Sequence, residues 1–433
     1  MNRLVVLIPA FLISCADIYA QRPNIIYIMS DDLGYGDLGS YGSTTPTPNI
    51  DKLAAGGMKF TNAYAAAPLC TPTRTALMTG KYPARTTVGL MEPLTASKND
   101  SAYGLSAGEA SIAGRMKEMG YSTALIGKWH LGFKPEYSPN KNGFEYFYGM
   151  HSGAADYISH KGNGRRIDFY ENENLKNSEG YLTHIFTDKA VEFMVQERNK
   201  PFFLVLTYNA PHWPWQEPGD LPYEDSVDFR KGGSREKYLA MIKAMDEGIG
   251  RIMKVVDSLD RLNNTVIVFT NDNGGERYSD HSGLSGAKAT LHEGGIRVPA
   301  IVSWAGKIPP GAVSGELIIT MDWMPTFLAL AGAINIDRYT LDGINILPVC
   351  LNNAVLGERV FFWRSFQRSR ENAVIRGKWK YLKNEQGSFL FDLSLDKEEK
   401  NDLKNLENET LEELKRQFAE WEKSMLKPIP LQG

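Results

Sequence analysis

Residues 24–34 have the sequence NIIYIMSDDLG, in which an apolar run of strand length leads directly into two adjacent carboxylates. A strand that is apolar at every position predicts a sheet buried on both faces, as in proteins whose helices cover a parallel sheet. Carboxylates at the end of such a strand offer the oxygen ligands that calcium and magnesium prefer. An aspartate after a strand can equally cap a helix or shape a turn, so Asp31 and Asp32 alone leave both interpretations open.

Three further strand-length runs also end in polar side chains. Residues 122–126, 202–207 and 266–270 lead into GKWHLG (127–132), NAPHWPW (209–215) and NDNGG (271–275). Helical patterns lie between the runs, and one of them is predicted to start at a capping box of Ser106 and Glu109 and to end at Gly120. This alternation predicts a largely parallel sheet with its chemistry at one edge. We therefore expect the polar residues of these segments to converge on the acidic pair; they are Lys128, His130, His212, Asp272 and Asn273.

Cys70 opens the segment CTPTRTALMTG (70–80), which has the pattern of a helix start. Thr71 can cap the helix, Pro72 suits its first turn, and Gly80 stands where the helix should end. Cys70 would then lie just ahead of a helix N-terminus, where backbone N–H groups favour negative charge. The alternative is an ordinary buried cysteine, which is the usual fate of a free one.

The same segment resembles the sulfatase signature C-x-P-x-R-x-x-x-x-T-G, although Thr73 stands where serine is commoner. The resemblance extends over essentially the whole mature chain, and the matching segments follow in family order. They are the acidic pair, the Cys70 segment, GKWHLG, PHWP (211–214), NDNGG, Lys288 before EGGIRVP (293–299), and FDLSLDKEEKNDL (391–403). The chain therefore resembles a type I sulfatase of the alkaline phosphatase-like superfamily, and in particular the exported bacterial carbohydrate sulfatases.

This resemblance implies an α/β fold with a large, mostly parallel sheet flanked by helices. A smaller C-terminal domain with an antiparallel sheet and a helix would follow. The resemblance also implies one Ca²⁺ ion, held by Asp31, Asp32, Asp272 and Asn273 and faced by the modified Cys70. A maturation enzyme, either formylglycine-generating or anaerobic sulfatase-maturating, would convert Cys70 to Cα-formylglycine, which Arg74 would orient. Four residues would surround the sulfate: Lys128, His130, His212 and Lys288.

The implied activity is sulfuric ester hydrolysis, of the arylsulfatase type, through a covalent sulfo-enzyme intermediate. His212 would protonate the leaving alcohol and His130 would assist the elimination, although these two roles could be exchanged. Two alternatives remain open: a phosphate or phosphonate monoester hydrolase of the same superfamily, and a non-catalytic glycan-binding lipoprotein. The expected substrate is a sulfated carbohydrate taken from the surroundings of the cell.

The glycine-rich segment 149–166 lacks periodicity, which predicts a loop. Loops of this kind often carry specificity, so we expect sugar contacts from its polar residues and from the aromatic residues near His212. The candidates are His151, Asp156, His160 and Arg165, together with Trp213, Trp215 and the region of His281.

Residues 1–20 have the composition of an export signal, with Arg3 before an apolar run over residues 4–13. Cleavage after Ala20 would give a periplasmic or secreted protein. LISC (12–15) instead resembles a bacterial lipobox, which would leave a lipid anchor at Cys15 and place the protein on the outer membrane or cell surface. The run is too short for a membrane-spanning helix.

The rest of the chain predicts a catalytic domain over residues 22–349 and an α+β subdomain over 350–433, in which short strand-like runs precede an amphipathic pattern at 409–425. Cys70 and Cys350 are the only cysteines after residue 20, so the protein is not a disulfide scaffold. A net charge of −3 gives no indication of a nucleic-acid partner.

Overall fold

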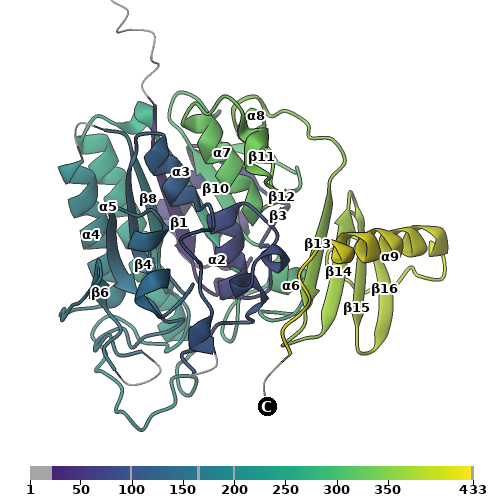
Figure 1. The fold of residues 1–433 in the computed structure, drawn as a ribbon, viewed down its shortest axis with the longest axis horizontal. Helices are drawn as coiled ribbons and strands as arrows, with labels where there is room; N and C mark the ends of the chain where they lie inside the picture. The colour runs from purple at the N-terminus through teal and green to yellow at the C-terminus, as the bar shows by residue number, and fades with distance from the viewer. Residues whose placement is uncertain (1–21, 98–99, 163–165, 198–199, 431–433) are drawn as a thin grey trace, which may run out of the picture.

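The computed structural model describes residues 22–97, 100–162, 166–197 and 200–430 (Figure 1). The predicted export signal with Cys15 and Ala20, and the predicted sugar contact Arg165, lie outside these ranges. Within them, no helix is both long and apolar enough to cross a membrane.

A ten-stranded sheet forms the centre of the large domain, in the order β11-β2-β10-β9-β1-β8-β4-β5-β6-β7. Its four central strands are β9 (Thr265–Asn271), β1 (Asn24–Ser30), β8 (Phe202–Thr207) and β4 (Ser122–Lys128). They run parallel to one another and are buried along their whole length. The predicted parallel sheet is therefore confirmed, and the polar segments after these strands lie at one edge.

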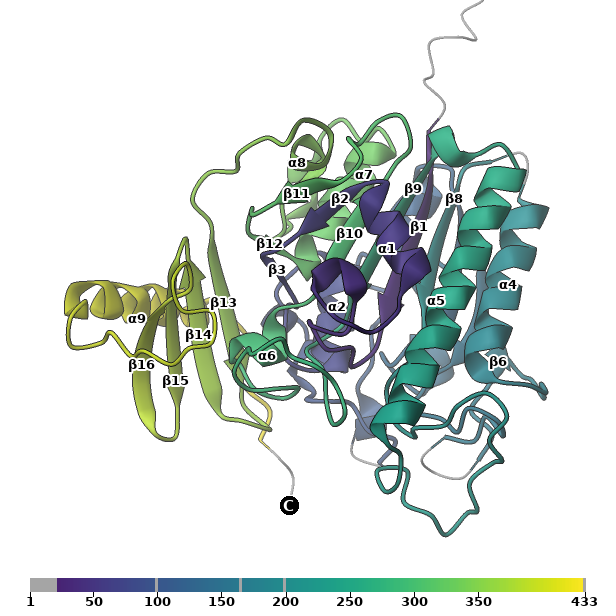
Figure 2. The same ribbon diagram turned by 180° about the vertical axis from the view of Figure 1, so that it is seen from behind.

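Helices cover both faces of this sheet because the side chains of its strands alternate between two apolar cores. Ile26 and Ile28 of β1 pack in one core, and Ile25, Tyr27 and Met29 pack in the other. The first core holds α1 (Pro48–Ala55), α4 (Leu182–Gln196) and α5 (Arg235–Ser258), and Figure 2 shows α1 and α5 on this face. The second core holds α2 (Cys70–Thr79), α3 (Ile112–Glu118), α7 (Trp323–Leu330) and α8 (Leu347–Asn352).

Short strands that the sequence pattern did not indicate extend the sheet on both sides. β5 (Tyr146–Met150) pairs parallel to β4, so the predicted loop at 149–166 begins inside a strand. On the other side β10 (Ala300–Ser303) runs antiparallel to β9. The remaining short elements are β2 (Met58–Phe60), β3 (Ala63–Tyr64), β6 (Tyr170–Glu171), β7 (Asn174–Leu175), α6 (Glu293–Ile296), β11 (Ala312–Ser314) and β12 (Ile318–Ile319).

Two predicted helix starts are wrong by a few residues. α2 begins at Cys70 itself, and the Thr71 hydroxyl donates to the His130 carbonyl at 3.2 Å instead of capping the helix. α3 begins after Ser111, whose hydroxyl accepts from the Gly114 N–H at 3.0 Å. The capping pattern at Ser106 is thus not used. Gly80, in contrast, ends α2 in the left-handed conformation that its position predicts.

The C-terminal domain is an antiparallel sheet of β13 (Val360–Ser365), β14 (Glu371–Arg376), β15 (Trp379–Asn384) and β16 (Gly387–Asp392), and α9 (Asn408–Lys423) covers one face (Figure 1). This matches the predicted antiparallel sheet and closing helix. α8, which contains Cys350, packs in the core of the large domain.

A buried ionic network joins the large domain to the face of the C-terminal sheet that lies opposite α9. Nζ of Lys380 on β15 lies 2.9 Å from Glu293 Oε1 and 2.8 Å from Glu399 Oε1, and all three side chains are fully buried. Arg297 Nε lies 2.6 Å from the other oxygen of Glu293. Burial alone would raise the pKa of Glu293, but Lys380 and Arg297 hold it at about 2. α6, which starts at Glu293, is therefore fixed by the C-terminal domain.

Replacing Lys380 by methionine is expected to lower the free energy of unfolding by about 3–5 kcal/mol, because Glu399 would stay buried without a cation. The matched control is Lys378→Met, which removes a pair with Asp392 in which the lysine side chain is half exposed. That change should cost less than about 1 kcal/mol. Urea unfolding followed by tryptophan fluorescence measures both. Equal losses would show that the buried network contributes no more than a surface pair.

Candidate active site

A cavity of about 770 Å³ opens at the carboxyl ends of the central strands. The sequence-predicted residues on its wall are Cys70, His130, His212, Trp213 and Lys288. These five residues come from four chain segments far apart in the sequence. His130 and His212 follow β4 and β8, and parallel strands deliver their ends to the same edge of the sheet.

Cys70 lies in the first turn of α2 and is 2% exposed. Burial raises the pKa of its thiol, and the positive charges of Lys128 and Lys288 only partly offset this rise. At neutral pH the side chain is therefore a thiol and not a thiolate. A thiol in this state is a poor nucleophile.

The acidic residues meet as predicted, because β1 and β9 are adjacent and in register, with Ser30 opposite Asn271. The Asn273 amide donates to Asp32 Oδ1 at 2.7 Å, and the Asp32 N–H donates to Asp272 Oδ1 at 3.4 Å. Asp32 itself has φ 63°, a left-handed conformation that is uncommon for a residue with a side chain. Strain of this kind collects at functional sites.

These residues fit a calcium ion. Asp31 Oδ1 and Asn273 Oδ1 are buried and have no hydrogen-bond partner among the described residues, so two oxygens remain free for a cation. Asp31, Asp32 and His212 bring ligand atoms within 4.8 Å of one another. His212 was expected beside the sulfate, and its closeness to the acidic pair was not predicted. An oxygen-rich donor set suits calcium better than zinc.

Two buried cations, Arg74 and Lys128, and the partly exposed Lys288 balance the carboxylates. Arg74 Nη2 lies 3.2 Å from Asp31 Oδ2 and 3.0 Å from Asp272 Oδ2, so Arg74 positions the acidic residues in addition to its predicted role beside Cys70. Lys128 is paired with Asp31, and Lys288 Nζ lies 2.6 Å from Asp32 Oδ2. Burial would raise the pKa of Asp31, but Lys128 and Arg74 outweigh it and hold the pKa below its ordinary value.

Backbone carbonyls fix the two histidine rings. His130 Nε2 lies 2.8 Å from the Leu94 carbonyl, which can only accept, so the proton is assigned to Nε2 and the lone pair to Nδ1. His212 Nδ1 donates to the Trp213 carbonyl at 2.6 Å, which leaves the lone pair on Nε2, 3.6 Å from Asp32 Oδ2. Burial, followed by the nearby lysines, lowers the pKa of both rings well below the ordinary value. Both are therefore neutral and able to accept a proton.

Three of the predicted sugar contacts do not line the cavity, because their side chains pack inside the large domain. His151 is stacked between Phe147 and Tyr170, with ring centroids 5.4 and 4.4 Å away. His160 bonds to the Gly180 carbonyl at 2.9 Å.

Asp156, the third of these, accepts from the Gln216 side chain at 3.1 Å and from the backbone N–H of Tyr223 at 2.8 Å. Trp215 and His281 also lie off the cavity wall, with Trp215 packed against Tyr278 and His281 3.1 Å from the Ser279 hydroxyl.

Arg166 lies on the cavity wall and belongs to the segment that was expected to contact sugar. Four other residues on the wall escaped the sequence analysis: Asp168, Arg230, Glu276 and Arg368. Arg166 is the neighbour of the predicted Arg165, so the basic pair in that loop was a usable signal. Arg368 comes from the C-terminal domain, and no local pattern connects it with the site.

Comparisons with known proteins agree with this geometry. The Sulfatase family model matches residues 23–333, and the model of the N-sulphoglucosamine sulphohydrolase C-terminal region matches residues 286–424. N-acetylgalactosamine-6-sulfatase of Homo sapiens is 35% identical over 369 residues, which cover 79% of this chain and 69% of the relative. Arylsulfatase A of Bos taurus is 34% identical over 415 residues, with coverages of 87% and 78%.

Solved structures show the same relationship. Ps i-CgsB, in complex with k-i-k-neocarrahexaose, matches with a TM-score of 0.83 at 32% identity over 94% of each chain. The phosphonate monoester hydrolase of Agrobacterium radiobacter reaches a TM-score of 0.63 at 19% identity, over 93% of this chain and 96% of that one, and shares the fold alone. The family match thus covers most of the chain and both of its domains. The chain therefore belongs to the sulfatase family and is a sulfuric ester hydrolase.

Proposed function

We propose that this protein removes sulfate from glycans, using a Cα-formylglycine made from Cys70 and one calcium ion. The position of Cys70 carries the proposal: it lies on the cavity wall in the first turn of a helix, with Lys288 on the same wall. Burial keeps the unmodified thiol protonated, so Cys70 would need modification to serve as a nucleophile. A hydrated formylglycine supplies a hydroxyl that can attack sulfur and a second hydroxyl that can release the sulfate.

Asp31, Asp32, Asp272 and Asn273 would hold the calcium ion, which polarises the sulfate oxygens when bound. Lys128 and Lys288 add fixed positive charge. Lys128 is fully buried, where such charge is most effective, and Lys288 lines the cavity. Both lysines are held by carboxylates in the free protein, so they are oriented before a substrate arrives.

The two histidines divide the proton transfers. We assign protonation of the leaving alcohol to His212. The ring is neutral in the free protein, so it would first take up a proton at Nε2, where the Asp32 carboxylate at 3.6 Å would stabilise the imidazolium form. His130 has an unpartnered Nδ1 among the described residues and a pKa lowered by burial, which suits a proton acceptor.

A glycan substrate is supported by the size of the cavity and by the relatives. About 770 Å³ is far more space than a sulfate group needs. One relative is named for N-acetylgalactosamine 6-sulfate, and another was solved with k-i-k-neocarrahexaose. We also propose that the protein is exported, on the composition of residues 1–20.

The test is a direct comparison of sulfate and phosphate esters. Protein co-expressed with a formylglycine-forming maturation enzyme is expected to show an aldehyde in place of the Cys70 thiol by peptide mass spectrometry. It should cleave 4-nitrophenyl sulfate at least about 100-fold faster than 4-nitrophenyl phosphate. Faster cleavage of the phosphate, or of a phenyl phosphonate, would favour the phosphatase alternative. An unmodified thiol in active protein would exclude the formylglycine mechanism.

A further inference from the structure

The outer wall of the cavity carries three arginines that the proposed reaction does not use. Arg166, Arg230 and Arg368 come from three separate segments, and all three are exposed. None of them has an ion pair with a carboxylate elsewhere in the described ranges, whereas Arg74, Lys128 and Lys288 at the reacting end are each paired.

The two carboxylates on the same wall are already occupied. Asp168 accepts the backbone N–H groups of His151 at 3.3 Å and Ser152 at 2.7 Å. Glu276 Oε2 lies 3.7 Å from Nζ of Lys288. Asp168 is then the one carboxylate on this wall that is not paired with a cation in the described ranges, against three unpaired arginines, so the wall beyond the reacting residues has an excess of positive charge.

The Trp213 ring holds Arg230 at the cavity. The guanidinium carbon of Arg230 lies 5.2 Å from the Trp213 ring centroid, a cation–π distance that leaves the N–H groups free to donate. His212 packs on the same tryptophan, with ring centroids 4.4 Å apart. Trp213 thus has contacts that orient Arg230, and a sugar-stacking role is not needed to explain its position.

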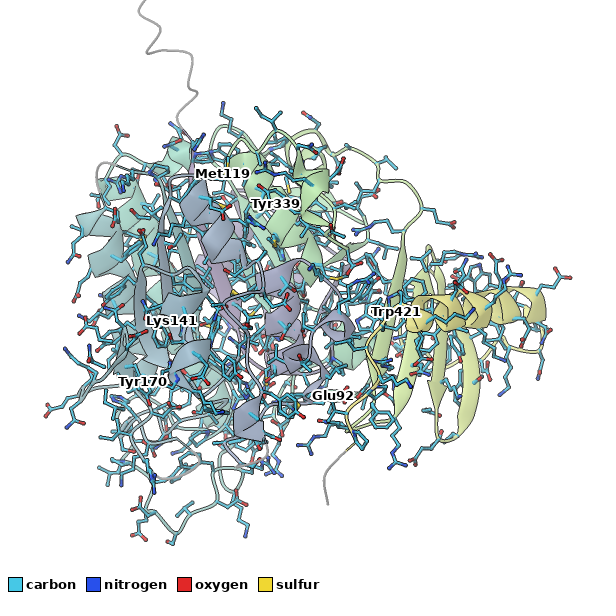
Figure 3. All side chains as sticks on the ribbon, viewed as in Figure 1. Glu92, Met119, Lys141, Tyr170, Tyr339 and Trp421 are labelled. Carbon is cyan, nitrogen blue, oxygen red and sulfur yellow. The ribbon has the colours of Figure 1, made fainter. Side chains whose placement is uncertain are left out.

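A second set of contacts fixes Arg368 over the cavity. Arg368 lies in the turn between β13 and β14, and its Nε donates to the Glu92 carbonyl at 2.9 Å. The Glu92 carboxylate accepts from the Ser365 hydroxyl at 2.9 Å and from the Phe366 N–H at 3.0 Å, so it clamps this turn. Figure 3 shows Glu92 on the side of the large domain that faces the C-terminal domain.

The same segment of the large domain also carries Leu94, whose carbonyl fixes the His130 ring. The segment at Glu92 therefore links the orientation of a catalytic histidine with the position of Arg368.

We propose that Arg166, Arg230 and Arg368 form a second anion-binding subsite, so that the preferred substrate carries another sulfate or carboxylate beside the scissile sulfate. The proposal rests on the proposed glycan sulfatase function and adds the class of glycan. Guanidinium groups match the geometry of sulfate and carboxylate oxygens with paired donors. A neutral sugar in this cavity would cover three arginines without offering a counter-charge, which disfavours it relative to an acidic sugar.

Binding to calcium-loaded, full-length Cys70→Ala protein tests this subsite without turnover. Isothermal titration calorimetry would compare three probes: N-acetylgalactosamine 6-sulfate, the 4,6-disulfate, and a disaccharide of glucuronic acid with N-acetylgalactosamine 6-sulfate. We expect at least one dianionic probe to bind about tenfold more tightly than the monosulfate. Whichever dianion gains affinity identifies the second group as sulfate or as carboxylate.

Arginine substitutions in the same background then locate the effect. Arg368→Gln and Arg230→Gln should each remove most of the preference for the dianion, and Arg368→Lys should keep more of it than Arg368→Gln. Arg370→Gln is the matched control, because Arg370 is exposed two residues further along the same turn and does not line the cavity. The control should keep the whole preference.

Equal affinity for all three probes, or a preference that survives both Arg230→Gln and Arg368→Gln, would overturn the subsite. The readout is a ratio of affinities within each variant, so a variant that binds every probe less tightly does not mimic the effect. If matured wild-type protein fails to cleave any sulfate ester, the proposed function falls, whereas the binding ratios are still measured independently.

Discussion

Cys70→Ala is expected to lower kcat/KM for 4-nitrophenyl sulfate by at least about 10⁴-fold, because it removes the group from which the nucleophile is made. The lysines, the histidines and the acidic residues would remain, but none of them can form and release the covalent sulfate ester. The assay uses wild-type and variant protein co-expressed with the same maturation enzyme. A variant that keeps more than about a tenth of the activity would contradict a nucleophile at Cys70.

The chain supplies its own control for this experiment. Cys350 is the other described cysteine, and it is 2% exposed in the core around α8. Cys350→Ala should leave kcat/KM unchanged while lowering the free energy of unfolding by about 1 kcal/mol or more, because it opens a small cavity. Loss of kcat/KM is therefore expected for Cys70→Ala alone, and Cys350→Ala shows whether lower stability by itself affects activity.

Removal of calcium is the second change with a large expected effect. Dialysis against EGTA is expected to lower kcat/KM by at least about 10²-fold, because the polarisation of the sulfate oxygens is lost. Calcium should restore the activity, and magnesium, which requires a tighter octahedral site, should restore less of it. Full activity of protein shown to be metal-free by elemental analysis would contradict the calcium site.

The stripped protein should nevertheless stay folded, because the site is balanced without the ion. Three buried carboxylates (Asp31, Asp32 and Asp272) face two buried cations (Arg74 and Lys128) and the partly exposed Lys288. Calcium at about 100 times its Kd would then add only about 3 kcal/mol to the free energy of unfolding. Thermal unfolding with and without EGTA measures this difference.

The sequence predicted the parallel sheet and the meeting of the acidic residues because both follow from local patterns. An apolar run is buried wherever it lies, and parallel strands bring their ends to one edge. The predicted Ser106 capping box failed because Ser111 caps the same helix five residues later. Nothing in the sequence around Ser106 shows which of two capping residues the tertiary structure will use.

The sugar contacts were harder to predict because polar residues in a glycine-rich segment have two possible fates. Histidines are common ligands, yet the rings of His151 and His160 stack against buried aromatic side chains. Arg368 shows the opposite case. It reaches the cavity only through contacts with Glu92, a residue more than 270 positions away, and such pairing over long sequence separations is not visible in a single sequence.

The buried link between Lys380 and Glu293 bears on how this protein can be divided or recombined. The segment that starts at Lys288 runs into Glu293, which is bound to Lys380 in the C-terminal sheet and to Glu399 in the loop after it. A gene shortened to residues 22–349 would encode every residue of the reacting centre. It would still lose the contact of Glu293 with Lys380, which fixes the segment that carries Lys288. Exchange of C-terminal domains between relatives would have to keep Glu293, Lys380 and Glu399 as one matched set.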